Sequence, residues 1–294
     1  MTPSPIPLSQ FGLGCVTFGR EIDAAGAAAM MDHAVARGIT FFDTAAAYGG
    51  GASETIVGQW LRDRRNRHSI TLATKILPPY APAAMDAVVH TSLDRLGVAS
   101  IDLLFLHRWD ATAENEATLR ALDRLVQTGR VRRLGASNFT AEQLERSLAL
   151  QSRLGLARFR ALQNIHNLAV RGIDPALRQL CVSGGIELIT YSPLGAGFLT
   201  GKHEGGVQPG SRFDIIPGHQ GVYFNDLARR RLARLKVVSA RSGIPMATLA
   251  LAWALRQPQV GTVLVGGRNV TQLDQAFQAR SFANSEWLRA LDAD

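Results

Sequence analysis

The 294-residue chain is 46% hydrophobic and 19% charged, the balance of a globular protein with a large core, and no apolar run reaches the roughly 18 residues of a membrane helix. Its formal charge of +8 rests on arginines spread over most predicted helices without interleaved aromatics, which disfavours nucleic-acid binding but suits an anionic small molecule. With only Cys15 and Cys181, and a polar start at Met1, we predict a cytoplasmic protein without disulfides or a signal peptide.

Short apolar segments then alternate with segments that have helical spacing. We predict a hairpin strand at 6–11, then barrel strands at 13–18, 39–42, 70–74, 101–106, 131–135, 162–166, 186–190 and 260–265. Helices are predicted at 23–37, 53–61, 83–96, 113–127, 140–150, from 174 onward, and at 225–242, 245–257 and 270–279. Gly38, Gly97 and Gly129 follow helices, where a left-handed residue ends them, and Asp174-Pro175 opens one.

Eight strand-then-helix units predict an α/β fold, a single (β/α)₈ TIM barrel over residues 1–294, because each parallel crossover needs a helix outside the sheet. An open doubly wound sheet would suit a shorter alternation. The barrel is expected to carry the N-terminal hairpin and a long loop after strand seven, at 192–224. That loop is rich in glycine and proline, and loops of this length are usually functional or disordered.

Reactive side chains follow three successive predicted strands. Asp43 and Tyr48 follow the second, Lys75 ends the third and His107 ends the fourth. In a barrel these carboxyl ends meet on the face where (β/α)₈ enzymes keep their chemistry. Singly, such residues are more often a cap, a solvated charge or a hydrogen-bonded core histidine. Together they predict an active site.

The motifs around these residues resemble the aldo-keto reductase family over nearly the whole chain. The resemblance rests on Phe42-Asp43-Thr44-Ala45, Tyr48-Gly49, Thr74-Lys75, Leu106-His107, Gly135-Ala136-Ser137-Asn138-Phe139, Gln163-Asn164 and the stretch from Tyr191-Ser192-Pro193 to Gly201-Lys202. His107-Arg108-Trp109 and the long loop are more similar to the bacterial and potassium-channel-β-like branches than to the aldose reductase branch.

This resemblance implies reversible carbonyl reduction. Tyr48 would protonate the nascent alkoxide, and Lys75 would lower the phenol pKa from its usual value of about 10. Asp43 would hold Lys75, and His107 would polarise the carbonyl of a small aldehyde or ketone. The residues themselves leave open a Schiff-base aldolase or isomerase using Lys75, which pairing with Asp43 disfavours. They also leave open a slow, redox-sensing regulatory subunit.

The resemblance also implies a nicotinamide cofactor in the second half of the barrel, with NADP(H) favoured over NAD(H). Ser137, Asn138 and Gln163 would bind the carboxamide, and Tyr191 would stack on the ring. The pyrophosphate would lie along the backbone of Ser192, Pro193, Leu194, Gly195, Gly197 and Leu199, beside the cations Lys202 and Arg212. On composition alone, this glycine-rich stretch would be read as a flexible loop.

An adenosine segment is implied at Gly266, Gly267, Arg268, Gln272 and Gln275, where a helix N-terminus forms an anion site. Arg268 would reach a 2′-phosphate, although a surface arginine without a role is the alternative. Val265, Gln275 and Ala276 depart from the family's usual proline, glutamate and asparagine. No metal-ligand spacing is present. The sequence leaves the substrate, the preferred direction and the oligomeric state open.

Overall fold

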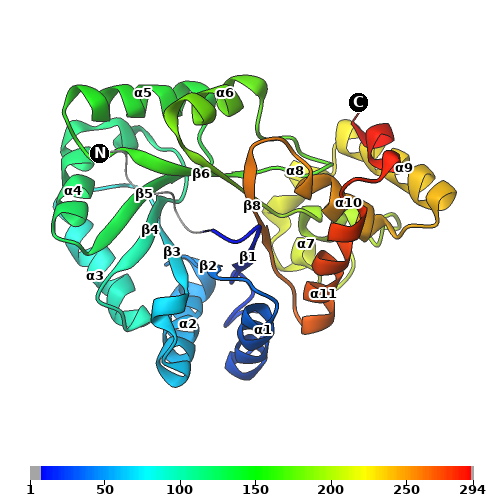
Figure 1. Ribbon diagram of the computed structural model, residues 1–294, viewed down its shortest axis with the longest axis horizontal. Helices are drawn as coiled ribbons and strands as arrows, with labels where there is room; N and C mark the ends of the chain where they lie inside the picture. The colour runs from blue at the N-terminus through cyan, green and yellow to red at the C-terminus, as the bar shows by residue number, and fades with distance from the viewer. Residues whose placement is uncertain (1–7, 293–294) are drawn as a thin grey trace.

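Eight parallel strands close into a barrel in sequence order, with β1 paired to both β2 and β8 (Figure 1). The computed structural model describes residues 8–292. The strands are β1 (Phe11–Gly14), β2 (Phe41–Asp43), β3 (Thr71–Ile76), β4 (Ile101–Leu106), β5 (Val131–Ser137), β6 (Phe159–Ile165), β7 (Glu187–Tyr191) and β8 (Val260–Val265). The predicted (β/α)₈ barrel is thereby confirmed.

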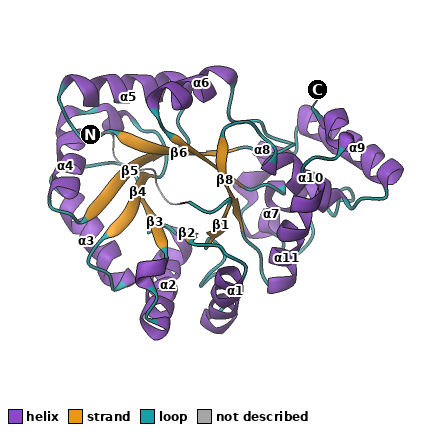
Figure 2. Cartoon of the chain, in the orientation of Figure 1, coloured by secondary structure: helices purple, strands orange, loops and turns teal. Residues whose placement is uncertain are grey.

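Helices surround the strands, as the purple and orange elements of Figure 2 show. Six follow the first six strands: α1 (Ala24–Ala36), α2 (Ala52–Arg64), α3 (Met85–Leu96), α4 (Glu116–Gln127), α5 (Ala141–Arg153) and α6 (Pro175–Gly184). Five more gather on one side of the barrel (Figure 1): α7 (Arg212–Ile215), α8 (Gln220–Tyr223), α9 (Asp226–Ser242), α10 (Met246–Leu255) and α11 (Val270–Ala279). Helix α11 packs against α1 and completes the ring.

Local signals fix most helix ends. The side chain of Asp23 accepts a hydrogen bond from the Gly26 amide at the start of α1, which satisfies one of the free donors there. Asp174 caps α6 in the same way, with Pro175 at the first helical position. Gly97 ends α3 with φ of 63°, a conformation that costs glycine little.

The described residues near the N-terminus differ from two predictions. The predicted hairpin falls partly on Ile6 and Pro7, which lie outside the described residues, and Phe11 belongs to β1 instead. Strand β1 ends at Gly14, because the chain turns back through a hydrogen bond from the Phe18 amide to the Cys15 carbonyl.

Ser53 is the first residue of the predicted second helix, but it does not cap that helix. Gly51 occupies the N-cap position of α2, with φ of 98°. The Ser53 hydroxyl instead donates to the Cys15 carbonyl at 2.8 Å and thereby ties α2 to the end of β1. Glu54 in the same turn is fully buried between Thr74 and Arg95.

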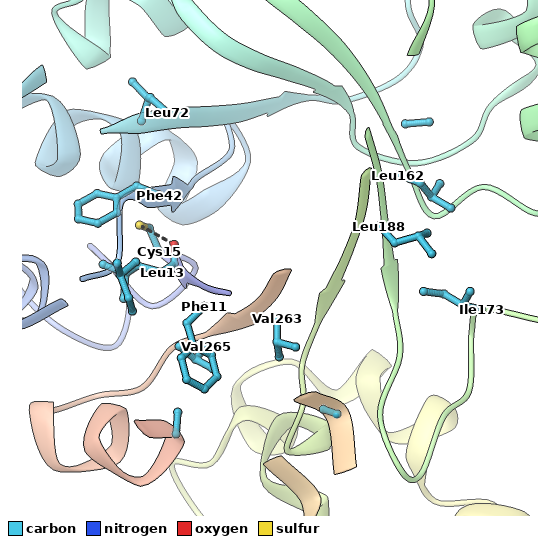
Figure 3. Packing of buried hydrophobic residues seen from close by; sticks show 14 of the residues in the cluster. Phe11, Leu13, Cys15, Phe42, Leu72, Leu162, Ile173, Leu188, Val263 and Val265 are labelled. Carbon is cyan, nitrogen blue, oxygen red and sulfur yellow. Dashed lines mark hydrogen bonds between the residues drawn. The ribbon is translucent and has the colours of Figure 1, made fainter. Parts of the chain in front are cut away.

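Side chains alternate between two apolar layers along each strand. Phe41, Ala73, Leu103, Phe105, Ala161, Ile189 and Leu264 fill the barrel interior. Their neighbours face outward and pack under the helices; Figure 3 shows Leu13, Phe42, Leu72 and Val265 of this outer layer. Because the interior is filled below, polar side chains further along the same strand faces lie at the barrel mouth.

The predicted long loop contains short helices. The 3₁₀ segment Gly195–Thr200 precedes α7 and α8, and the connection ends where α9 begins. In the described part of the chain no single helix is long and apolar enough to cross a membrane. Helices α9 and α10 meet that length and composition only jointly, across a bend of 108°.

Candidate active site

The strand alternation places the four predicted catalytic side chains at one end of the barrel. Asp43 follows the interior residue Phe41 by two positions, and Lys75 follows Ala73 in the same way. His107 continues the face of Phe105 just beyond β4. Tyr48 begins the short 3₁₀ turn after β2, and its ring lies 5.7 Å from the His107 ring.

Lys75 is the centre of this group. Its Nζ atom donates to Asp43 Oδ2 at 2.5 Å, to the Thr44 carbonyl at 2.9 Å and to Tyr48 Oη at 3.2 Å. All three ammonium protons therefore have acceptors. Asp43 and Lys75 are buried, with exposed fractions of 2% and 0%, and the pair keeps either charge from being isolated in the core.

Burial and charge oppose each other in setting the pKa of these groups. Burial disfavours the Lys75 ammonium, but Asp43 and Tyr48 outweigh it, so the pKa of Lys75 is raised. For Tyr48, burial raises the pKa above its usual value, and the lowering effect of Lys75 does not overcome it. The predicted lowering of the Tyr48 pKa by Lys75 is present, but enclosure of the phenol outweighs it. Tyr48 keeps its proton at neutral pH.

His107 is a neutral ring. Burial, with the charges of Lys75 and Arg108, lowers its pKa to about 3. Its Nδ1 atom is buried and has no hydrogen-bond partner among the described residues. Its backbone carbonyl accepts a hydrogen bond from Asn138 Nδ2 at 2.9 Å. This bond joins the segment after β4 to the end of β5.

The predicted nicotinamide residues form one hydrogen-bond network on the opposite side of the mouth. Asn138 has φ of 59°, and its Oδ1 accepts from the Tyr191 hydroxyl at 2.6 Å. The Ser137 hydroxyl donates to the Gln163 carbonyl at 2.8 Å. Gln163 Nε2 reaches across the barrel and donates to Asp43 Oδ1 at 2.8 Å. The proton-donor side and the amide side therefore share one carboxylate.

The glycine-rich segment after β7 is a tight, strained turn. Ser192 and Ala196 adopt φ of 57° and 56°, unusual for residues with side chains, next to Gly197 at 95°. Gly197 has a left-handed backbone, and a β-carbon on it would lie 2.9 Å from Lys202 Cε, so a larger residue would be strained and would displace the end of the lysine side chain. This geometry, rather than flexibility, accounts for the glycine.

The segment after β8 approaches the same space. Gly266 lies so close to β1 that a β-carbon on it would be 2.7 Å from the Gly14 carbonyl. Gln272 Oε1 accepts from the Arg268 amide at 2.8 Å. The Arg268 side chain extends to the Gly210 carbonyl of the long loop at 2.7 Å, so this arginine bridges the two segments.

A cavity of about 670 Å³ joins these parts. It is lined by most of the predicted site residues: Asp43, Tyr48, His107, Ser137, Asn138, Gln163, Tyr191, Ser192, Pro193, Leu194, Gly197, Lys202, Arg212, Gly266, Gly267, Arg268, Gln272 and Gln275. Lys75 lies behind Asp43. Gly195 and Leu199 do not reach the cavity, because Gly195 packs under Tyr223 and Leu199 is fully buried.

Several cavity residues carry no motif that marks them in the sequence. Thr17 donates to the Gly267 carbonyl at 3.0 Å and closes the gap between β1 and the last segment. Glu21 holds Arg20 at 2.7 Å and Arg212 at 3.4 Å, so it anchors the long loop to the loop after β1. Periodicity carries no signal for contacts between segments so far apart.

The cavity fits a dinucleotide cofactor. One end offers the amides of Asn138 and Gln163. The other offers Lys202, Arg212 and Arg268 beside the narrow glycine turn. Cations and closely approached backbone suit a chain of phosphates. Over residues 8–292, no three His, Cys, Asp or Glu side chains come together in a way that could hold a metal ion.

The chain is similar to known proteins over most of its length. The model of the Aldo/keto reductase family matches residues 10–287. Protein tas of Escherichia coli (strain K12) is 30% identical over 96% of this chain and 92% of its own length. A probable voltage-gated potassium channel subunit beta of Arabidopsis thaliana is 29% identical, covering 94% and 88%. Norsolorinic acid reductase B of Aspergillus parasiticus is 29% identical, covering 91% and 75%.

Proposed function

Because the chain belongs to the aldo/keto reductase family, we propose that it is an NADP(H)-dependent oxidoreductase that reversibly reduces an aldehyde or ketone to an alcohol. The observation that carries the proposal is the Lys75 ammonium between the Asp43 carboxylate and the Tyr48 hydroxyl, at the edge of a cavity with room for a dinucleotide. A buried charge cluster that borders such a cavity is a candidate for chemistry.

The residues of this chain have separate tasks. When bound, NADPH supplies the hydride that the carbonyl carbon receives. Tyr48 Oη gives its proton to the carbonyl oxygen, and the resulting phenolate is stabilised by Lys75. Asp43 holds Lys75 charged and in place. In the reverse direction, the phenolate takes the alcohol proton.

His107 prepares the carbonyl oxygen. A neutral imidazole carries one N–H, and with Nδ1 enclosed and unpartnered, Nε2 is the nitrogen available to a bound carbonyl. A hydrogen bond from Nε2 stabilises the negative charge that develops on the carbonyl oxygen during reduction. Such a donor therefore stabilises the transition state more than the ground state.

NADP(H) is the proposed cofactor because of the charges at the far end of the cavity. Arg268 lines the cavity just before α11, where its guanidinium would suit a 2′-phosphate. Gln272 holds the Arg268 backbone, and Gln275 lines the cavity one turn further on.

The test is direct. Purified protein is mixed with NADPH or NADH and with sugars, quinones, pyridoxal and short aldehydes, and absorbance loss is followed. We expect NADPH-dependent turnover of at least one carbonyl. If the protein binds neither dinucleotide, the proposal fails.

A second candidate rests on the relative named as a probable potassium channel subunit beta. In that case the chain would be a cofactor-binding redox sensor with slow turnover. Rapid turnover of a substrate in the screen, without a stable partner on purification, would contradict it.

A further inference from the structure

One carboxylate serves both sides of the barrel mouth. Asp43 Oδ2 accepts from Lys75 Nζ at 2.5 Å, and Asp43 Oδ1 accepts from Gln163 Nε2 at 2.8 Å. Lys75 belongs to β3 and Gln163 to β6, so the link crosses the barrel. The exposed fractions of Asp43 and Gln163 are both 2%, so water does not compete for these bonds.

The charge on Lys75 determines which way the Gln163 amide faces. The Asp43 carboxylate accepts a hydrogen bond from the Lys75 ammonium, and a carboxylate paired in this way only accepts hydrogen bonds. The Gln163 atom facing Asp43 must therefore be Nε2, the donor. Its Oε1, an acceptor, is then left as the group that Gln163 presents to the cavity it lines.

The neighbouring amide is fixed as well. Asn138 Nδ2 donates to the His107 carbonyl at 2.9 Å and to Ser137 Oγ at 3.1 Å, while Asn138 Oδ1 accepts from Tyr191. A backbone carbonyl can only accept, so this amide cannot be reversed. Neither amide can therefore turn freely to suit a ligand. Gln163 Oε1 consequently selects a ligand group that donates a hydrogen bond.

We propose that Asp43 is a positioning residue for the cofactor: through Gln163, it makes the site select the N–H₂ group of the nicotinamide carboxamide. This inference rests on the proposed NADP(H) function. It gives Asp43 two tasks, one toward Lys75 and one toward Gln163. The Asp43 carboxylate thereby connects the proton-donor side of the site to cofactor recognition.

The probe is NADP⁺ compared with its 3-acetylpyridine analogue, in which a methyl group replaces the carboxamide N–H₂. In the wild-type protein this methyl group would face Gln163 Oε1 and leave a buried acceptor unpaired. We expect roughly 5- to 100-fold weaker binding of the analogue, the usual penalty for an unpaired buried group. Dissociation constants are measured by calorimetry at neutral pH, without turnover.

Asp43→Asn is the decisive variant. The oxygen of the new amide has to accept from Lys75, so its N–H₂ group faces Gln163 and turns the Gln163 amide around. Gln163 then presents N–H₂ to the cavity, and the preference for the carboxamide should disappear or reverse. A wild-type ratio of the two dissociation constants in this variant would overturn the proposal.

Two further variants keep the test sound. Asp43→Asn leaves the Lys75 charge unpaired, so a double variant with Lys75→Met removes both charges if the single one does not fold. In the double variant the orientation of the Gln163 amide is no longer imposed. The ratio of the dissociation constants of the analogue and NADP⁺ should therefore approach one. Gln163→Leu removes the acceptor and should give the same result; a retained preference in either protein would contradict the role assigned here.

Gln272→Leu is the matched control at the other end of the cavity. Its amide holds the Arg268 backbone, so both dinucleotides should bind more weakly while the ratio of their dissociation constants stays at the wild-type value.

The outcomes for the wild-type protein separate this proposal from the proposed function. Wild-type protein that binds both dinucleotides equally well contradicts the role of Asp43 and leaves the proposed function standing. Wild-type protein that binds neither contradicts the function itself.

Discussion

Lys75 Nζ lies 3.2 Å from the Tyr48 hydroxyl, close enough for a hydrogen bond between a side chain of β3 and one of the turn after β2. The same ammonium is 4.9 Å from the centre of the Tyr48 ring. A charge in this position stabilises the phenolate more than the phenol, so it acts when Tyr48 gives up its proton.

Tyr48→Phe removes the proposed proton donor and keeps the ring. We expect carbonyl reduction to fall by at least roughly 10²- to 10⁴-fold, the usual contribution of general acid catalysis. The affinity for NADPH, measured by fluorescence titration, should stay at its wild-type value. Turnover close to that of the wild type would exclude Tyr48 as the acid.

Lys75→Met should unfold more easily, because it leaves the Asp43 carboxylate buried without its cation. The expected loss in the free energy of unfolding is about 3–5 kcal/mol, measured by urea denaturation. The double variant with Asp43→Asn has no buried charge and should recover much of this loss. Equal destabilisation in both proteins would mean that the ion pair is not the cause.

His107 links stability to pH. Its pKa is lowered from 6.5 to about 3 in the folded protein, so below pH 6.5 the unfolded chain binds a proton that the folded chain does not. The contribution of neutral His107 to the free energy of unfolding is therefore complete above pH 6.5. It is lost as the pH falls toward 3. His107→Gln should show a shallower loss of unfolding free energy over this interval. Parallel curves for the two proteins would show that His107 does not contribute.

Arg268→Ala should weaken NADPH binding more than NADH binding, because only NADPH carries the 2′-phosphate. A charge-assisted contact of this kind corresponds to roughly 10- to 100-fold in the dissociation constant. Arg289→Ala, in the C-terminal 3₁₀ segment and outside the cavity lining, serves as the control and should leave both affinities unchanged. A loss shared equally by both cofactors would show that Arg268 does not distinguish them.

Gly197→Ala tests the turn beside Lys202. The new methyl group would displace the Lys202 side chain, and the left-handed backbone would cost about 1–2 kcal/mol with a side chain present. We expect weaker NADPH binding, measured by titration, together with a lower free energy of unfolding. Gly205→Ala, where nothing lies within 4 Å of the added carbon, should change neither. Unaltered binding in Gly197→Ala would remove this turn from the cofactor site.

The N-terminal region shows where sequence reasoning failed. The apolar residues beyond Gly14 look like a longer strand, yet the chain turns at Cys15 because its backbone pairs with the end of β2 and with Phe18. Ser53 has the chemistry of a helix cap, but packing turns its hydroxyl toward Cys15. In both cases a contact between segments outweighed a local preference.

The sequence alone determined the barrel and the four reactive side chains. The alternation of short apolar strands with helices leaves few other folds, and a two-residue period carries Asp43 and Lys75 from the filled interior to the mouth. Only the tertiary structure decided that Gln163 shares the Asp43 carboxylate and that Glu21 holds Arg212. Such contacts form when the closing ring brings distant segments together, and local periodicity carries no information about them.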